Sequence, residues 1–392
     1  MDLLMHGAAS DQTPGIDGHS VLRIVCFRVL VRTIVLVAAA ALVSGCSEIE
    51  YYWQGIAGQT DLLARAKPIT EVIATTSDTA LKNRLARAQE IRAFASQELA
   101  LPDNRSYTSY ADLGRPYAVW NVFAAPELSL TPRQWCFPVA GCVNYRGYFS
   151  EADARAEAAR LAAAGDDVHM SGIPAYSTLG YFDDPVLSTF VNWPDTDLAG
   201  LIFHELAHGR VFVPGDTPFN EAFASFVERR GVVEWLLATQ DQALIDATQA
   251  RWKTSDRFVA YLLEWRDELQ RLYDQPYNTF ALRVLKTELL TAMETCYRTN
   301  ADRFGDQDWY FASGRLNNAR FVPLAAYNEL RESFETLFAQ SGESWPQFYS
   351  KVAEIGGLNS EARTEAMKSL GDAYRLDHPS ESADLSCAAL VF

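Results

Sequence analysis

Apolar residues recur at helical spacing through most of the second half of the chain. We expect helices over 219–239, 241–273, 279–299, 324–340 and 345–355. The same spacing predicts a helical region over 59–100. An Ala-rich helix over 150–164 is expected to begin at Ser150, because a serine side chain can accept a hydrogen bond from the first helical amides.

Strand patterns lie between these helical stretches. Residues 107–149 are rich in Tyr, Val and Phe and are broken by Pro and Gly, which predicts strands over 118–123 and 142–149. Residues 168–191 alternate weakly and could supply a sheet edge. The order of elements predicts an α+β fold, with a mixed α/β lobe over 46–215 and a mainly helical lobe over 216–392.

One further helix is expected over 196–213, because its apolar residues recur with a period of about four. Asp195 or Thr196 could cap its start, and the Pro-Gly pair at 214–215 would end it. The stretch before His204 is apolar nearly all round, which predicts that the helix is buried.

This helix contains the sequence His204-Glu205-Leu-Ala-His208. Residues four apart lie on one face of a helix, so the two imidazoles can be neighbouring ligands of one Zn²⁺. Glu205 lies beside them and could take a proton from a zinc-bound water. A buried pair of histidines beside a buried carboxylate is costly unless something pairs with them, and a metal ion would do so.

A catalytic zinc needs a third protein ligand and an open position for water. Glu221 falls in the first turn of the next expected helix, which a short turn brings back to the histidines. Glu228 shares its helical face and is the rival ligand, although it lies about two turns, roughly 10 Å, further along. Glu221 could instead be an acidic residue that the helix dipole favours at a helix start.

The two segments together resemble the gluzincin peptidases, whose signature is His-Glu-x-x-His followed by an Asn-Glu pair. The chain as a whole looks like the bacterial "putative aminopeptidase" lipoproteins. The resemblance implies a gluzincin-like fold, with His204, His208 and Glu221 as zinc ligands and Glu205 as the base. It also implies a peptide substrate.

Two departures from the gluzincin pattern concern the substrate. The spacer from His208 to Glu221 is shorter than in most gluzincins, and the Gly-x-Met-Glu-Asn segment that holds a substrate's amine in many of their aminopeptidases is absent. Residues 171–178 could replace it as an edge strand beside the cleft, but they contain no acidic residue. Asp183 and Asp184 follow and could pair with an ammonium, or could lie in a solvated loop.

The N-terminal residues have the pattern of a bacterial lipoprotein signal peptide over 1–45. Arginines flank an apolar run over 33–43 that is short for a membrane span and ends at Val-Ser-Gly-Cys46. We expect lipidation of Cys46 and anchoring of the mature chain to a membrane through that lipid. Ser47, rather than Asp, follows the cysteine, which by resemblance to bacterial sorting rules indicates the periplasmic side of the outer membrane.

The net charge of the chain is −16, and removal of residues 1–45 would leave it unchanged. An acidic protein is a poor nucleic-acid binder, so we expect no nucleic-acid partner. The expected compartment is oxidising, which makes disulfides plausible. Cys136 and Cys142 enclose a turn-like stretch and could form a local bridge, leaving Cys296 and Cys387 as a second pair.

Other residues could assist catalysis, although each fits ordinary packing or a surface loop better. His169 precedes the expected edge strand, and Arg315 or Arg320 could bind a substrate carboxylate. Possible oxyanion donors are Tyr273, Tyr277, Tyr310 and Tyr327.

These observations predict a zinc-dependent metallopeptidase in which Glu205 activates a zinc-bound water for attack on a peptide bond. Aminopeptidase activity is favoured by the resemblance. An oligoendopeptidase is the alternative within the same chemistry, and a non-catalytic zinc-containing lipoprotein with a binding or assembly role is the alternative outside it.

Overall fold

The computed structural model describes residues 49–137, 141–178, 182–312, 314, 316–326 and 330–377. The chain forms two units, Met1–Ala57 and Gly58–Phe392. Cys46 lies outside the described residues, and the expected signal peptide and the lobe boundary at 215/216 stay predictions. Of the first unit, residues 49–57 are described and are helical; this helix continues to residue 65. No helix in the described part of the chain combines the length and apolar composition needed to cross a membrane.

The larger sheet has the order β6-β3-β7. Its central strand β3 (Val119–Pro126) is almost fully buried, as its run of apolar residues predicts. β3 pairs antiparallel with β6 (Arg146–Tyr148) and with β7 (Asp166–Ile173), in a register that runs from Val119 opposite Ile173 to Pro126 opposite Asp166. β7 is therefore an edge strand, as the weak alternation after residue 168 indicated.

Two smaller sheets accompany the larger one. β1 (Lys67–Pro68) and β8 (Val186–Leu187) pair with β2 (Ser109–Ala111), and the β2–β8 pair is parallel. β4 (Trp135–Phe137) and β5 (Gly141–Val143) form a hairpin.

Disulfide bonds occur at three of the expected cysteines. Cys136 and Cys142 lie opposite one another in the β4–β5 hairpin and form a disulfide. Cys296 is also disulfide-bonded, whereas its expected partner Cys387 lies outside the described residues.

The helices of the first half are shorter than expected. The expected helical region over 59–100 is split into the end of the 49–65 helix, α2 (Ile69–Thr75) and α3 (Thr79–Gln97), because Pro68 and the extended Thr76 interrupt it. α4 (Glu151–Ala163) begins at Ser150, whose side chain accepts a hydrogen bond from the Asp153 amide, as expected.

α5 (Asp195–His208) is the helix of the histidine pair, and both of its ends differ from the prediction. Its first turn has no side-chain cap, because the Asp195 carboxylate pairs with Arg84 and Arg87 instead. Its last residue is His208 rather than Val213.

The C-terminal region is mainly helical, which confirms the predicted α+β class. Its elements are α6 (Thr217–Thr239), α7 (Gln242–Tyr273), α8 (Thr279–Thr299), α9 (Ala301–Phe304), α10 (Asp308–Ala312), the 3-10 helix η1 (Asn318–Ala326), α11 (Arg331–Gln340), α12 (Trp345–Gly356) and α13 (Ser360–Asp377). The expected helix over 324–340 is wrong at its start, because Pro323 lies in a 3-10 segment and the α-helix begins only at Arg331.

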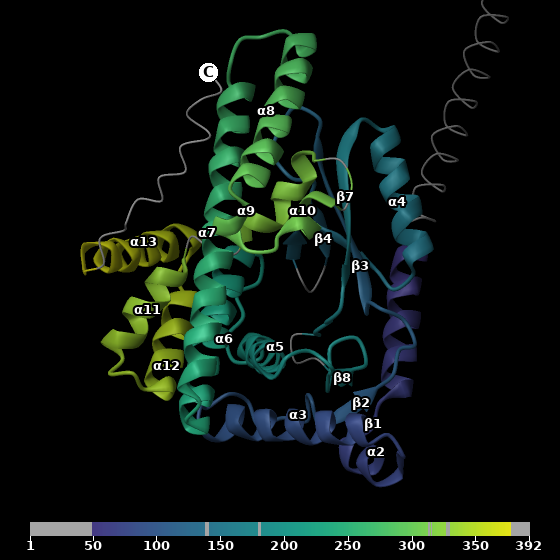
Figure 1. The fold of residues 1–392 in the computed structure, drawn as a ribbon, viewed down its shortest axis with the longest axis vertical. Helices are drawn as coiled ribbons and strands as arrows, with labels where there is room; N and C mark the ends of the chain where they lie inside the picture. Colours follow the sequence, from purple (N-terminus) through teal and green to yellow (C-terminus); the bar gives the residue numbers. More distant parts are fainter. Residues whose placement is uncertain are drawn as a thin grey trace, which may run out of the picture. The chain divides into compact units, whose positions relative to one another are not determined.

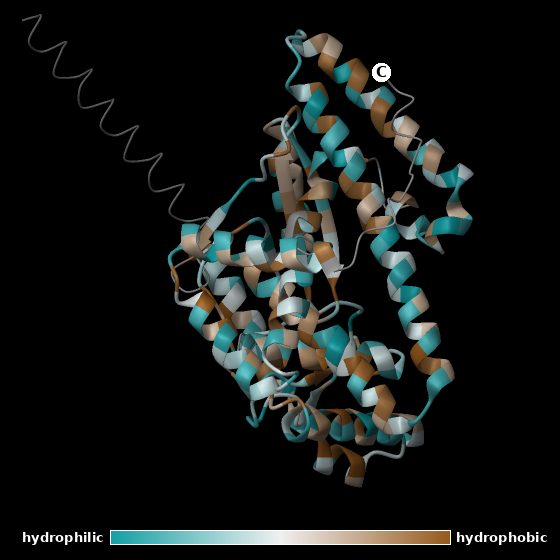
Figure 2. Ribbon diagram, turned by 90° about the vertical axis from the view of Figure 1, so that its left-hand side faces the viewer, coloured by the Kyte–Doolittle hydropathy of each residue, from teal (hydrophilic) through white to brown (hydrophobic). Residues whose placement is uncertain are grey.

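Helices cover both faces of the larger sheet. α4 packs against β3 and β7 on one side, and η1 packs against the same strands and joins them to α7 (Figure 1). The helices carry apolar stripes between hydrophilic residues (Figure 2), and these stripes form two main cores. One core surrounds α5 and α6 and includes Phe203, Phe223 and Phe348; the other lies between α7 and α8 and includes Trp265 and Tyr297.

A buried polar group, here called the lysine cluster, fixes the sheet to these helices. Lys286 on α8 donates to the Asp167 carboxylate on β7 at 2.5 Å and to the Glu127 carbonyl at 2.7 Å. Asn318 on η1 donates its backbone amide to the same carboxylate and its side-chain amide to carbonyls that follow β3. Tyr273 donates to the Asn318 side-chain oxygen at 2.8 Å, so the charges and amides of this cluster are paired.

Candidate metal and active site

The last turn of α5 and the first turn of α6 meet at the predicted ligands. The Nε2 atoms of His204 and His208 are 3.2 Å apart, and they lie 3.3 and 3.7 Å from the two carboxylate oxygens of Glu221. One ligand atom from each residue falls within 4.8 Å of the others. Within the described ranges this is the only such group of three, and it is called the metal-ligand group below.

The connection between α5 and α6 is short, and side chains of its own residues and of α6 hold it by hydrogen bonds. The Asn220 side chain accepts a hydrogen bond from the Val213 amide and donates one to the Val213 carbonyl, both at 2.8 Å. Asp216 caps α6 by accepting a hydrogen bond from the Phe219 amide. α5 therefore ends early, because the backbone after His208 is bound by α6 instead of continuing the helix.

The metal-ligand group is buried and electrostatically unbalanced. Burial, and to a smaller extent the neighbouring His204, lower the pKa of His208 to about 4. Burial also acts to lower the pKa of His204, but hydrogen bonds to Glu221 and Glu228 outweigh it and raise that pKa well above its usual value. Burial acts to raise the pKa of Glu221, yet the two histidines hold it below its usual range.

Glu228 lies behind His204 rather than beside the ligand atoms. Its carboxylate is 3.0 Å from Nδ1 of His204, the nitrogen that faces away from Glu221. Gly200, one turn before His204, leaves room for it, because a Cβ there would lie 3.2 Å from the Glu228 side chain. Glu228, the alternative third ligand in the sequence analysis, is thus placed to orient the His204 ring, as carboxylates behind metal-bound histidines do.

The donor set fits a divalent metal ion. Two imidazole nitrogens and one carboxylate converge on one point, which is the ligand set that zinc accepts in sites with an open position. One imidazole can donate a hydrogen bond through Nε2 to Nε2 of the other ring. Nδ1 of His208 is buried with no hydrogen-bond partner among the described residues. A metal ion bound by both Nε2 atoms would take the place of the hydrogen bond between the rings.

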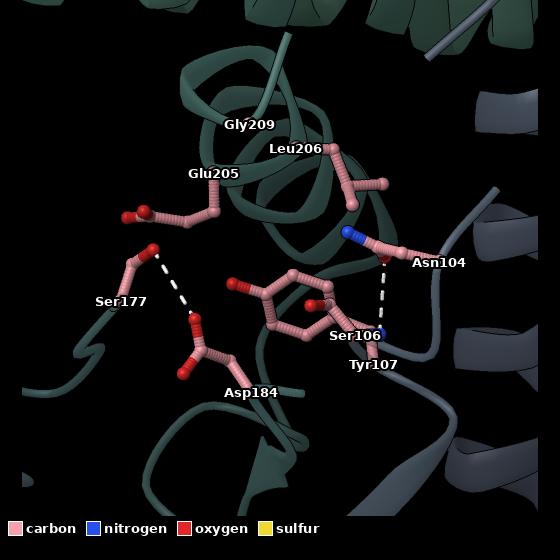
Figure 3. A pocket seen from close by; sticks show the side chains of 8 residues that line it. All are labelled: Asn104, Ser106, Tyr107, Ser177, Asp184, Glu205, Leu206 and Gly209. Atoms are coloured by element: carbon pink, nitrogen blue, oxygen red, sulfur yellow. Dashed lines mark hydrogen bonds between the residues drawn. The ribbon is translucent and has the colours of Figure 1, made fainter. Parts of the chain in front are cut away.

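Glu205 lines a small pocket beside α5 (Figure 3). Tyr107 and Asn104 come from the loop before β2, and Ser177 and Asp184 from the segment between β7 and β8. Burial raises the pKa of Glu205 to about 7, against the opposing charge of His204. A carboxyl group that can gain and lose a proton near neutral pH suits general acid–base chemistry, and a nearby dication would draw this pKa down.

The two aspartates at 183 and 184 have different environments. Asp183 is partly exposed and pairs with Arg105 at 2.5 Å, which fits the solvated loop that the sequence allowed. Asp184 is buried, with 3% of its surface exposed, and lines the Glu205 pocket. Its carboxylate accepts hydrogen bonds from the Thr178 amide and hydroxyl and from the Ser177 hydroxyl, and burial raises its pKa.

The remaining sequence candidates that the structure describes lie outside the metal-ligand group and the Glu205 pocket. His169 stacks on Phe123, and burial together with Arg320 lowers its pKa to about 4. Arg320 is 3% exposed and lies over the Tyr310 ring, so it is not available to a substrate carboxylate. Tyr273 belongs to the lysine cluster, and Tyr277 is half exposed in the turn between α7 and α8. Tyr327 and Arg315 lie outside the described residues.

No pattern in the sequence pointed to Tyr107 as a site residue. Its loop has no periodicity, and the residue approaches Glu205 only because the parallel β2–β8 pair brings two distant segments together. The sequence weakly indicated that Glu228 lies near the histidines, because it follows Glu221 by seven residues on the same helical face.

Comparisons with known proteins gave one match. A family model described as "Putative aminopeptidase" matches residues 50–367. Neither the curated proteins nor the solved structures compared with the chain gave a match. The matched range includes the metal-ligand group, Glu205 and its pocket, and it supports a peptidase-like function acting on peptides.

Proposed function

Because the chain belongs to the Aminopep family, whose model is described as a putative aminopeptidase, we propose that it is a zinc-dependent metallopeptidase that acts as an aminopeptidase. The observation that carries the proposal is the convergence of His204, His208 and Glu221 with Glu205 beside them. Three ligands leave a position open, whereas a structural zinc site is usually closed by four. A carboxyl group next to the ligands has no structural purpose.

The chain's own residues would divide the chemistry between them. A bound Zn²⁺ supplies Lewis-acid chemistry, because it polarises a carbonyl group and makes water more acidic. His204, His208 and Glu221 would hold the ion, and Glu228 would keep the His204 ring in its orientation through Nδ1. Glu205 would accept a proton from the attacking water and pass it to the amine that leaves.

The lipid anchor belongs to the same proposal. The signal pattern ending at Cys46 supports lipidation and attachment to the periplasmic side of a bacterial outer membrane. The Cys136–Cys142 disulfide agrees with an oxidising compartment. Incorporation of labelled palmitate that disappears in Cys46→Ser would support the anchor, and labelling unchanged in that variant would contradict it.

The test of the activity is a cleavage profile on a mixed peptide library, with the protein first stripped of metal and then reloaded with zinc. Stepwise trimming from the amino end is expected, and it should vanish on chelation and return with zinc. Internal cutting would replace aminopeptidase by oligoendopeptidase. No cutting by the zinc-loaded protein would overturn the peptidase proposal.

The metal ligand from α6 has its own test. Glu221→Gln should reduce the zinc retained after dialysis from about one ion per chain to a small fraction, because it removes one of three ligands. Glu234→Gln, the same change further along α6, is the matched control. Full zinc retention in Glu221→Gln would exclude Glu221 as a ligand.

A further inference from the structure

The Glu205 pocket holds two carboxyl groups and no cation. Asp184 and Glu205 both line it, and the other lining residues contribute amide, hydroxyl and apolar groups (Figure 3). The Ser177 hydroxyl is hydrogen-bonded to Asp184 at 3.3 Å and lies beside the Glu205 carboxylate (Figure 3). A hydroxyl has one proton to donate, so it cannot satisfy both carboxylates at once.

Tyr107 provides an independent sign of a ligand. The residue is 3% exposed, and its hydroxyl points into the space between Glu205, Ser177 and Asp184 (Figure 3). That hydroxyl makes no hydrogen bond to any residue that the structure describes. Buried tyrosine hydroxyls usually find a partner, so a polar group is expected to enter this space.

Hydrogen bonds from buried residues hold the loop that forms the pocket wall in one position. Arg92, itself 5% exposed, donates to the carbonyls of Pro102, Asn104 and Ser106 and so fixes the loop that carries Tyr107. The Tyr107 amide donates to the Asp184 carbonyl at 2.6 Å. Tyr107 has a φ of +63°, a conformation that a bulky residue adopts only when its surroundings enforce it.

Two carboxyl groups and several hydroxyl oxygens suit a small cation that can donate hydrogen bonds to them. An ammonium group meets the two carboxyl groups, and Asp184 retains an accepting position, since a carboxylate offers about four and three are used. In a peptide cut after its first residue, the α-ammonium nitrogen is two bonds from the scissile carbonyl carbon. A carboxylate that shares a pocket with the base is therefore within reach of that nitrogen.

We propose that Asp184, with Tyr107 beside it, is the subsite that recognises the free α-ammonium of the peptide substrate. This inference rests on the proposed peptidase function and gives it direction, because an ammonium held here limits cleavage to the first peptide bond. Asp184 takes the place of the acidic residue that the 171–178 segment lacks, and Ser177 and Thr178 of that segment hold its carboxylate.

The experiment compares the zinc-loaded wild type with Asp184→Asn and with Asp183→Asn as the matched control. Substrates are one hexapeptide with a free amine and the same hexapeptide N-acetylated. The wild type should prefer the free peptide by about 100-fold, and Asp184→Asn should lower kcat/KM for it by about 10- to 100-fold, the range for a lost charged hydrogen bond. Asp183→Asn should retain the wild-type values, because its carboxylate pairs with Arg105 outside the pocket.

Binding of leucinamide, measured by calorimetry, tests the subsite without turnover. The wild type should bind leucinamide at least 10-fold more tightly than N-acetyl-leucinamide, and Asp184→Asn should lose that difference while keeping its zinc. If leucinamide binds selectively but no peptide is cut, the subsite stands and the peptidase proposal fails. Equal binding of both probes, or unchanged selectivity in Asp184→Asn, would overturn the subsite whatever the activity.

Asp184→Asn could disturb folding, because its carboxylate holds Thr178. Tyr107→Phe removes only the hydroxyl and keeps the buried ring, so it serves as the second variant. It should weaken leucinamide binding by about 2- to 10-fold, as for a single neutral hydrogen bond, with an unchanged thermal unfolding midpoint. Leucinamide binding in Tyr107→Phe that equals the wild type would remove Tyr107 from the subsite.

Discussion

The lysine cluster and the metal-ligand group are both buried and charged, yet they differ in how completely their polar groups are hydrogen-bonded. In the lysine cluster Lys286 meets the Asp167 carboxylate and a backbone carbonyl, and Asn318 uses its amide and its oxygen. In the metal-ligand group two imidazole nitrogens face each other at 3.2 Å, and a further ring nitrogen has no partner among the described residues.

The difference separates a structural role from a binding role. A buried charge that is fully paired stabilises one arrangement of the chain, and nothing more can be added to it. A buried group with conflicting or missing partners costs folding free energy, and it persists where a ligand completes it. The comparison therefore predicts that changes in the lysine cluster will act on stability and changes around the metal-ligand group on function.

The largest effect is expected from Glu205→Gln. Loss of the proton acceptor should reduce kcat/KM for peptide hydrolysis by about 10²- to 10⁴-fold, the usual contribution of general acid–base catalysis. Zinc content and the unfolding midpoint should stay close to wild type. Glu71→Gln, an exposed change on α2, is the control. Hydrolysis that survives Glu205→Gln would contradict the mechanism.

Asp167→Asn should have the opposite signature. It leaves the buried Lys286 without its counter-charge, so the free energy of unfolding in urea should fall by about 3–5 kcal/mol while zinc still binds. Arg283→Gln breaks the exposed Arg283–Glu127 pair nearby and should leave the free energy of unfolding close to wild type, because exposed ion pairs contribute little. If Asp167→Asn lowered zinc affinity without lowering stability, the two regions would not differ as described.

Glu228→Gln lies between these extremes. The variant should still load zinc from an excess, but its zinc dissociation constant should rise about 10- to 100-fold, because an outer partner of a ligand histidine is weakened. Competition with a chromogenic chelator measures this constant. An affinity as low as that of Glu221→Gln would make Glu228 a direct ligand instead.

His169 offers the smallest and most specific effect. Its pKa of about 4 in the folded chain lies below the unfolded value of about 6.5, so the unfolded chain binds more protons between these pH values. Stability should therefore fall as the pH drops from 6.5 to 4, and His169→Gln should remove about 2 kcal/mol of that fall. Urea unfolding of both proteins at pH 7 and pH 4.5 measures the difference; identical slopes would show that His169 does not contribute.

The sequence predicted what depends on local spacing. The grouping of the histidine pair with Glu221 follows from helical periodicity and a short turn, and the Ser150 cap follows from residue type. The early end of α5 was missed, because it depends on Asn220 reaching back to Val213. The Glu205 pocket was missed for a related reason, since it forms where β2 and β8, more than seventy residues apart, lie side by side.

The Asn220 side chain has a consequence for how this protein can change over time. Its two hydrogen bonds to Val213 tie the segment that follows α5 to the first turn of α6 and so fix the distance between them. Added or deleted residues between Gly209 and Val213 would move Asn220 and the first turn of α6 relative to α5. Glu221 would then be separated from the histidines. We therefore expect insertions to be tolerated in the turn after α7 but not in this spacer. The metal-ligand group thus requires the spacer to be short.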